Sequence, residues 1–168
     1  VVLLIELRDG IRRVGLRKGI AIAVLGGGYR VEAIKLRRGC GKGVVAARVT
    51  GPVSFNMIGL WARGPGYSKD VMRSIASCRP IIYTGPTVIL GDFNSGTKLG
   101  ADGRLTKGHP PIVSALAALG LVSAYHVFHQ VEHGREAHAT YRHLFNPSQP
   151  WHIDFCFVPA AWAERIDS

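Results

Sequence analysis

Asp92 and Asn94 are two polar residues that follow an apolar segment, Val88–Gly91, near the middle of the chain. A carboxylate at the end of a buried strand is held rigidly and suits a hard cation such as Mg²⁺, which prefers oxygen ligands. Residues two apart in an extended segment point to the same side, so Asn94 is expected beside Asp92. The pair therefore favours metal-assisted attack on phosphorus, in which the amide contacts a phosphoryl oxygen or orients a water. The alternative is a plain turn after a strand.

A second polar pair, His152 and Asp154, lies in the alternating segment from His152 to Val158, which ends at Pro159. In a strand these two residues share one face, because side chains alternate with a period of two. A histidine and an aspartate near a strand start can bind phosphate or orient a reacting group. The alternative is a pair of strand residues whose hydrogen bonds serve the fold alone.

The chain has seven histidines, and His126, His129 and His133 have the spacing of one helix face. Such a set could hold a transition metal such as zinc or copper. Glu132 and Glu136 are the acidic residues close enough in the sequence to add a carboxylate. The alternative is a group of loop histidines on a polar surface.

The elements that must position these residues follow from short apolar segments separated by glycine and proline. Strands are predicted at 19–25, 29–36, 44–49 and 55–61, which suggest an antiparallel meander, and again at 87–90, 121–125 and 152–158. Helices are predicted at 67–77, with Ser68 as N-cap, and at 112–119, closed by Gly120. The polar stretch 126–150 is predicted to be a loop. The fold class is therefore α+β, in a single domain spanning residues 1–168.

The composition is that of a globular domain, with 47% hydrophobic and 19% charged residues among 168. No apolar run reaches the roughly 18 residues that span a bilayer, so no membrane partner is expected. The cysteines Cys40, Cys78 and Cys156 are far apart and form no CxxC pair. They indicate reduced thiols, and with them a cytoplasmic location.

The formal charge is +10 and is concentrated near the start, where residues 1–50 hold 11 basic and 3 acidic side chains. Such a field attracts polyanions, which favours a phosphate-bearing partner such as nucleic acid. The alternative is that these residues occupy solvated strand edges, which Lys and Arg protect from pairing. The three tryptophans are scattered in the sequence, so no platform for stacking bases is predicted.

Three sequence motifs follow one another along the chain: "VILGDFNS" at 88–95, "TYRHLF" at 140–145 and "WHIDFCFVP" at 151–159. Together with "FNMIGLWAR" at 55–63 and "GLVSAYH" at 120–126, this order resembles the endonuclease/exonuclease/phosphatase superfamily, which includes DNase I-like and exonuclease III-like enzymes. The resemblance implies a two-sheet α/β sandwich with the active site at one end. It also implies one or two Mg²⁺ or Mn²⁺ ions and hydrolysis of phosphoester bonds by activated water.

The resemblance also implies roles for three catalytic candidates. Asp92 matches the motif aspartate that acts on the nucleophilic water or near the metal. Asn94 matches the asparagine that contacts the scissile phosphate beside the metal, so both residues are candidate metal-site residues. Asp154 matches the aspartate that supports the family's catalytic histidine.

Three further residues are candidates for substrate binding by the same resemblance. His152 precedes the strand of Asp154 and could contact phosphate. Tyr141 follows Thr140 in a loop that resembles a substrate-facing one. Trp61 stands where many members carry a histidine or tyrosine near the site.

The sequence departs from the family pattern near both ends. The family begins with an Asn-bearing strand and a strand ending in Gln-Glu, whose glutamate binds metal; Glu6 is the nearest counterpart and has no preceding Gln. The family ends with Ser-Asp-His, which has no match here. The sandwich is therefore predicted to be truncated at both ends, with exposed sheet edges through which two copies could form a homodimer.

Two hypotheses follow. The leading one is a Mg²⁺- or Mn²⁺-dependent hydrolase of the nuclease type, acting on nucleic acid or a nucleotide-like phosphoester. The alternative is a catalytically impaired or inactive domain of the same fold that binds nucleic acid or a protein partner. The sequence alone does not distinguish DNA, RNA, phospholipid and small phosphoesters as substrates.

Overall fold

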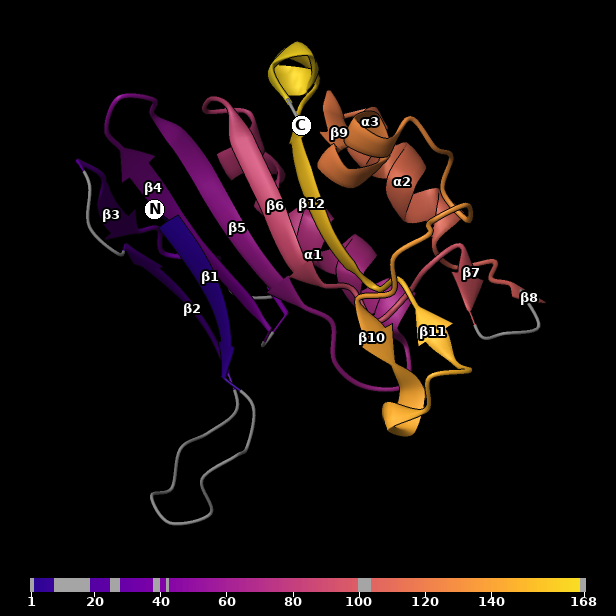
Figure 1. Ribbon diagram of the computed structural model, residues 1–168. Helices are drawn as coiled ribbons and strands as arrows, with labels where there is room; N and C mark the ends of the chain where they lie inside the picture. Colours follow the sequence, from indigo (N-terminus) through magenta and orange to yellow (C-terminus); the bar gives the residue numbers. More distant parts are fainter. Residues whose placement is uncertain are drawn as a thin grey trace.

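A six-stranded mixed sheet dominates the computed structural model, which describes residues 2–7, 19–24, 28–37, 40–41, 43–99 and 104–166. Its strands lie in the order β3-β4-β5-β6-β12-β9 (Figure 1). Their bounds are β3 Arg30–Ala33, β4 Val44–Thr50, β5 Phe55–Trp61, β6 Thr87–Asp92, β9 Leu121–Ser123 and β12 Asp154–Pro159. β5 and β6 are parallel, and the other neighbours in this sheet are antiparallel.

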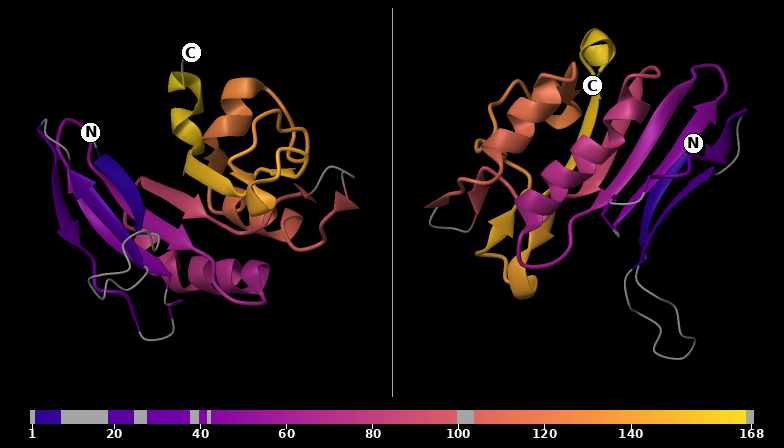
Figure 2. Two further views of the ribbon diagram at one scale, coloured as in Figure 1. Left: turned by 60° about the horizontal axis from the view of Figure 1, so that its bottom comes forward. Right: turned by 180° about the vertical axis from the view of Figure 1, so that it is seen from behind.

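Helix α1 (Tyr67–Ile82) connects the parallel strands β5 and β6, as such a pair requires a crossover. It begins after Gly66, so the predicted N-cap Ser68 lies inside the helix, and no side-chain cap bond forms. α1 and α2 (Pro110–Ala117) cover one face of the sheet, seen from behind in Figure 2. Apolar side chains of both helices share one core cluster with alternate residues of the sheet: Val71, Ile75, Ile112, Leu116, Leu60, Ile89 and Phe155.

A two-stranded antiparallel sheet, β1 (Val2–Leu7) with β2 (Gly19–Val24), lies over the opposite face of the large sheet. β2 contacts β4 and β5. The fold is thus a mixed α/β structure with one large and one small sheet, as the resemblance predicts. The predicted meander is correct only in part. β3, β4 and β5 form this meander. β2 instead pairs with β1 in an antiparallel register over six residues of each strand.

The stretch 126–150, predicted to be a loop, contains several short elements, and that prediction is wrong. Helix α3 (Ala124–His129) occupies its start, and the β10–β11 hairpin (Tyr141–Arg142 with Pro150–Trp151) occupies its end, joined through the turn η1 (His143–Phe145). Short two-residue strands leave no periodic apolar pattern, so the sequence could not reveal them. The β7–β8 pair (Lys98–Leu99 with Arg104–Leu105) and the turn η2 (Ala160–Arg165) complete the described elements.

No helix among the described residues is both long enough and apolar enough to cross a bilayer. The three cysteines are free thiols, as predicted. β3 and β9 form the edges of the large sheet, and a homodimer through such edges stays a prediction.

Candidate active site

Trp61, Asp92 and Asp154 lie side by side on three neighbouring strands. Trp61 is the register partner of Asp92 across β5 and β6, and Asp92 is the register partner of Asp154 across β6 and β12. Register partners project to the same face of a sheet. Leu60 and Ile89 belong to the core under α1, so the three site residues, which alternate with them, project from the opposite face. The fold therefore brings together residues that are predicted from three separate parts of the sequence.

Asp92 is held by Asn94. The side chain of Asp92 is nearly buried, with 7% exposed, and its Oδ1 accepts the Asn94 backbone N–H at 2.7 Å. The Asn94 amide nitrogen donates to Asp92 Oδ2 at 2.9 Å and to the Ala62 carbonyl at 3.0 Å. Asn94 has φ +46°, a left-handed conformation, so the predicted extended geometry is wrong. The two side chains meet through a turn, which asparagine tolerates better than most residues.

Gly91 sets the approach of β6 to β5 immediately before Asp92. Its φ is +139°, and a Cβ at this position would overlap the Leu60 carbonyl oxygen. Only glycine therefore fits at this position, so a steric requirement explains why the motif contains glycine before Asp92.

Asp154 is positioned through Thr140. The Thr140 hydroxyl oxygen accepts the backbone N–H groups of Ile153 at 3.0 Å and Asp154 at 3.1 Å. The Thr140 N–H in turn donates to the Trp151 carbonyl at 2.9 Å. Tyr141 follows as the first residue of the β10–β11 hairpin and is the register partner of Trp151. Thr140 was not among the predicted site residues, and only its position before Tyr141 could have pointed to it.

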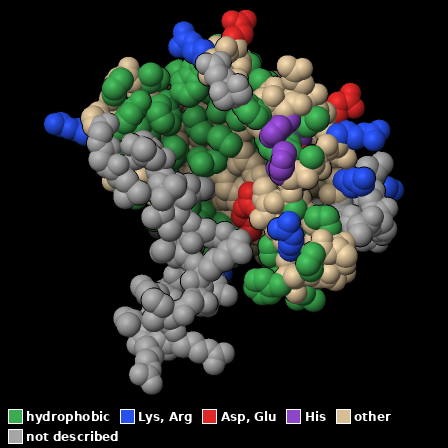
Figure 3. Space-filling model, viewed as in Figure 1, with side chains coloured by type: hydrophobic (Ala, Val, Ile, Leu, Met, Phe, Trp, Pro, Cys, Tyr) green, Lys and Arg blue, Asp and Glu red, His purple; other side chains and the backbone are tan. Residues whose placement is uncertain are grey.

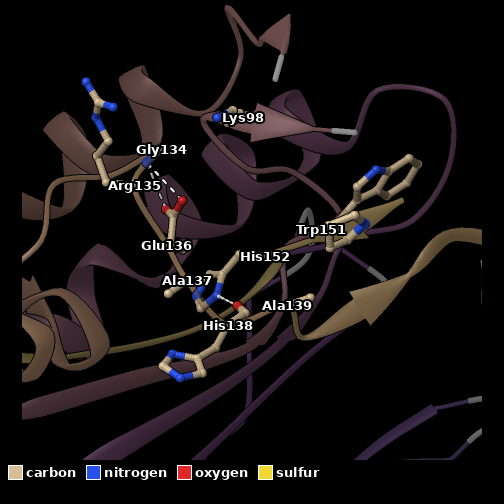
Figure 4. Close-up of a pocket in the computed structure, with 10 residues that line it drawn as sticks. Lys98, Gly134, Arg135, Glu136, Ala137, His138, Ala139, Trp151 and His152 are labelled. Atoms are coloured by element: carbon tan, nitrogen blue, oxygen red, sulfur yellow. Dashed lines mark hydrogen bonds between the residues drawn. The ribbon is translucent and has the colours of Figure 1, made fainter. Parts of the chain in front are cut away.

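His152 precedes β12 instead of sharing its face with Asp154, because the strand begins two residues later than predicted. Its ring is 7% exposed, and its Nδ1 lies 2.8 Å from the His138 carbonyl oxygen, to which it can only donate (Figure 4). Burial lowers the pKa of His152. A neutral ring with a proton on Nδ1 presents a lone pair at Nε2, which has no hydrogen-bond partner in the described part of the chain. The role of His152 in substrate binding stays a prediction.

A cavity of about 360 Å³ adjoins His152. Figure 4 shows Lys98, His138, Trp151 and His152 around it, together with Arg135. This volume is in the range of small-ligand sites, roughly 300–1,000 Å³. Its lining also includes the carboxylate of Glu136, so cationic, acidic and aromatic side chains all border this cavity.

Arg63 adds a positive charge beside the carboxylates. Its guanidinium carbon lies 4.7 Å from the centre of the Trp61 ring, a cation–π arrangement. Trp61 thus contacts Arg63 near the end of β5, and its role in substrate binding stays a prediction. Sequence reasoning singled out Trp61 but missed Arg63.

Four histidines gather around Phe155 on the side of α3, namely His109, His126, His133 and His152, with ring centroids 4.6, 6.3, 6.0 and 5.0 Å from that of Phe155. Burial lowers the pKa of both His109 and His133 to about 4. Of the trio predicted from helical spacing, His126 and His133 come together, whereas His129 is exposed. Glu136 joins them: burial alone would raise its pKa, but hydrogen bonds from His126 and the Gly134 amide hold it at about 2.

The donor set at Asp92 and Asp154 fits a hard divalent cation. Two carboxylates on one face supply oxygen ligands, and Mg²⁺ commonly completes its shell with waters and substrate phosphate. Glu6, the weak counterpart of the family glutamate, pairs through its backbone with Ile20, and its side chain lies outside what the structure describes.

Solved structures of other proteins share this arrangement of strands. A 3′-5′ exonuclease, NExo, from Neisseria meningitidis matches with a TM-score of 0.55 and 19% identity over 81% of this chain. The 3′ phosphatase NExo from Neisseria, bound to a product DNA hairpin, matches with a TM-score of 0.62 and 17% identity over 97% of this chain. The chain has the endonuclease/exonuclease/phosphatase fold. The endonuclease domain of TRAS1, a telomere-specific non-LTR retrotransposon, shares this DNase I-like fold with a TM-score of 0.54 and 16% identity over 97% of this chain.

The chain spans 59%, 68% and 69% of the lengths of these three structures, respectively. No family model and no curated protein matches the sequence. At these identities the DNase I-like likeness establishes the fold, and activity has to be argued from the site.

Proposed function

We propose that this chain is a divalent-metal-dependent phosphoester hydrolase that acts on nucleic acid. The observation that supports this most is the alignment of Trp61, Asp92 and Asp154 in one register, with Asn94 bonded to Asp92. Three of the neighbours in fold are named as a 3′-5′ exonuclease, a 3′ phosphatase and an endonuclease domain, which are names of phosphoester hydrolases.

Each residue of the candidate site has a separate proposed role. Asp92 and Asp154 would hold the cation and the attacking water on one face of the sheet. Asn94 fixes the Asp92 carboxylate, because its amide N–H groups donate to Asp92 Oδ2 and to the Ala62 carbonyl. His152 is proposed to contact the substrate through the cavity that it lines with Lys98 and Trp151. When bound, Mg²⁺ or Mn²⁺ neutralises charge on the phosphoryl oxygens. Positioning and charge stabilisation are the main requirements of phosphoryl chemistry, and both are met by rigid strand ends.

Nucleic acid is the substrate class that the surface favours. In Figure 3, hydrophobic side chains gather over β4–β6, whereas the other half of this face carries His side chains and several Lys and Arg side chains, with acidic ones among them. The β10–β11 hairpin on this second half has an exposed apolar tip, with Leu144 78% and Phe145 96% exposed.

The same hairpin contains aromatic rings that the scattered sequence positions did not suggest. The His143 and Trp151 rings stack with centroids 4.4 Å apart, and the Tyr141 ring lies 5.8 Å from that of Trp151. Exposed aromatic and apolar side chains can stack on bases or enter a groove as a wedge. We therefore propose that these rings, which lie together despite their scattered sequence positions, and Tyr141 among them, take part in substrate binding.

The test uses a DNA hairpin with a 3′ phosphate, an unphosphorylated hairpin and a chromogenic phosphodiester, each with Mg²⁺ and with chelator. We expect metal-dependent turnover that Asp92→Asn lowers by at least about 100-fold. Glu164→Gln, an exposed acidic residue in η2 at the other end of β12, is the matched control and should leave turnover unchanged. DNA binding without turnover in the wild type would instead support the alternative of an inactive binding domain.

A further inference from the structure

His126 and His133 lie beside Phe155, whose side chain is on the face of the sheet opposite to Asp92 and Asp154, and Glu136 joins them from the edge of the cavity that His152 lines. The Nε2 atom of His126 lies 3.0 Å from Glu136 Oε1, and both side chains are at least nine-tenths buried. The His126 and His133 rings are 3.6 Å apart between centroids. One nitrogen or oxygen of each of the three residues lies within 4.8 Å of the others.

We propose that His126, His133 and Glu136 form a second metal site, distinct from the Mg²⁺ site, for a transition-metal ion of the Zn²⁺ type. Two imidazoles and one carboxylate are a donor set that suits Zn²⁺ and not Mg²⁺, which takes oxygen ligands. Three protein ligands leave a fourth tetrahedral position for water. The 3.0 Å separation of the His126 and Glu136 atoms is close to the spacing of two ligands on one such ion.

Each end of the site is oriented by a further hydrogen bond. The His126 Nδ1 atom lies 2.7 Å from Ser123 Oγ, so its other nitrogen is directed at Glu136. Both Glu136 oxygens accept the Gly134 N–H, at 2.9 and 3.0 Å. Metal-binding histidines and carboxylates are typically held in this way by partners behind them.

His133 is the ligand that must move. Its ring is nearly parallel to that of His126, at 22°, and stacked rings do not aim two in-plane lone pairs at one point. The His133 Nδ1 atom is buried and has no hydrogen-bond partner among the described residues, so that atom loses no bond when the ring turns. A cavity of about 260 Å³, lined by His126 and His133 together with apolar Val113, Val127 and Phe157, provides space beside the pair.

The site differs from the one that sequence spacing suggested. His129 is exposed and packs against Tyr125, with ring centroids 4.3 Å apart, and is not a member. Glu136 takes the third place, because the turn at Gly134, with φ +94°, brings the chain back toward α3.

The experiment measures Zn²⁺ binding to chelator-treated protein by calorimetry and elemental analysis, with excess Mg²⁺ present. We expect one Zn²⁺ per chain in the wild type, and at least about 100-fold weaker binding in His133→Asn and Glu136→Gln. His129→Asn is the matched control and should bind like the wild type. Ser123→Ala should weaken binding roughly 10- to 100-fold, as loss of a partner behind a ligand does.

Two further readouts keep the result independent of folding and of hydrolysis. Co²⁺ substituted into the wild type should give the visible absorption of a four-coordinate site, and imidazole ¹⁵N shifts should change at His126 and His133. Asp92→Asn should bind Zn²⁺ unchanged even though the proposed hydrolase activity is lost. Absence of a saturable single Zn²⁺ in the wild type, or equal loss in His129→Asn and His133→Asn when both are folded by circular dichroism, overturns the proposal.

Discussion

Asp92 and Asp154 lie directly opposite each other on the adjacent antiparallel strands β6 and β12. Like charges at opposed positions repel unless something holds them there. Asn94 donates two hydrogen bonds to Asp92, and two N–H groups at the start of β12 are anchored by Thr140. Two opposed carboxylates also supply oxygen ligands to one cation, which is consistent with the proposed metal site.

Asn94→Gly should separate the role of the Asn94 amide from its role in the backbone. Both variants lose the hydrogen bonds to Asp92 and Ala62, but glycine accepts φ +46° without strain, so Asn94→Ala should lose about 1 kcal/mol more free energy of unfolding than Asn94→Gly. Both variants lose the amide and should lose at least about 10-fold in turnover of the chromogenic phosphodiester. Urea denaturation and initial rates measure the two effects. Full activity in the folded glycine variant would remove Asn94 from the site.

Gly91→Ala should destabilise the protein by about 2 kcal/mol or more, because its Cβ overlaps the Leu60 carbonyl oxygen. Gly64→Ala is the matched control: Gly64 also has positive φ, +87°, but open space around it, so it should lose only about 1 kcal/mol. Equal losses in urea denaturation would mean that the close approach of β5 and β6 at Gly91 relaxes easily.

Replacing Leu144 and Phe145 together by serine should weaken binding of a DNA hairpin about tenfold, since stacking on a base contributes roughly 1–3 kcal/mol. The two side chains are exposed, so the melting temperature should stay the same. Turnover of the small chromogenic ester should also be unchanged, because it does not reach the hairpin. Tyr83→Ser, another exposed aromatic at 70%, serves as control. Unaltered DNA affinity in the double variant would exclude the hairpin tip from the interface.

Stability should fall as the pH drops from about 6.5 to about 4. His109 is fully buried, and burial lowers its pKa from 6.5 to about 4, so below 6.5 the unfolded chain takes up a proton that the folded chain refuses. The shift corresponds to roughly 3 kcal/mol. His109→Asn removes this titration while its amide can still meet Ser95, which bonds the native ring at 3.1 Å. The melting temperature of the variant, in chelator, should depend less steeply on pH in this window; identical slopes would contradict the assignment.

The sequence revealed the site residues better than their arrangement. Asp92 and Asp154 stand out because each borders an apolar segment, and the resemblance gave them roles. Their opposition across β6 and β12 depends on pairing between segments some sixty positions apart, which no local pattern encodes. Long strands and helices were predictable from their periodicity.

Contacts made by loops were not predictable. Arg63 reaches Trp61, and Glu136 reaches His126, through turns whose direction depends on the packed core. Asn94 is a residue whose contact was predicted but whose backbone conformation was not. It was correctly expected beside Asp92, but for an extended geometry that a left-handed turn replaces.

The Thr140 hydroxyl has a mechanical consequence. It accepts the N–H groups of Ile153 and Asp154, while the next residue, Tyr141, begins the hairpin that presents Phe145. Thr140 therefore ties the start of the β10–β11 hairpin to the start of β12. We expect a ligand that binds at the exposed hairpin tip to shift the backbone that orients the Asp154 carboxylate.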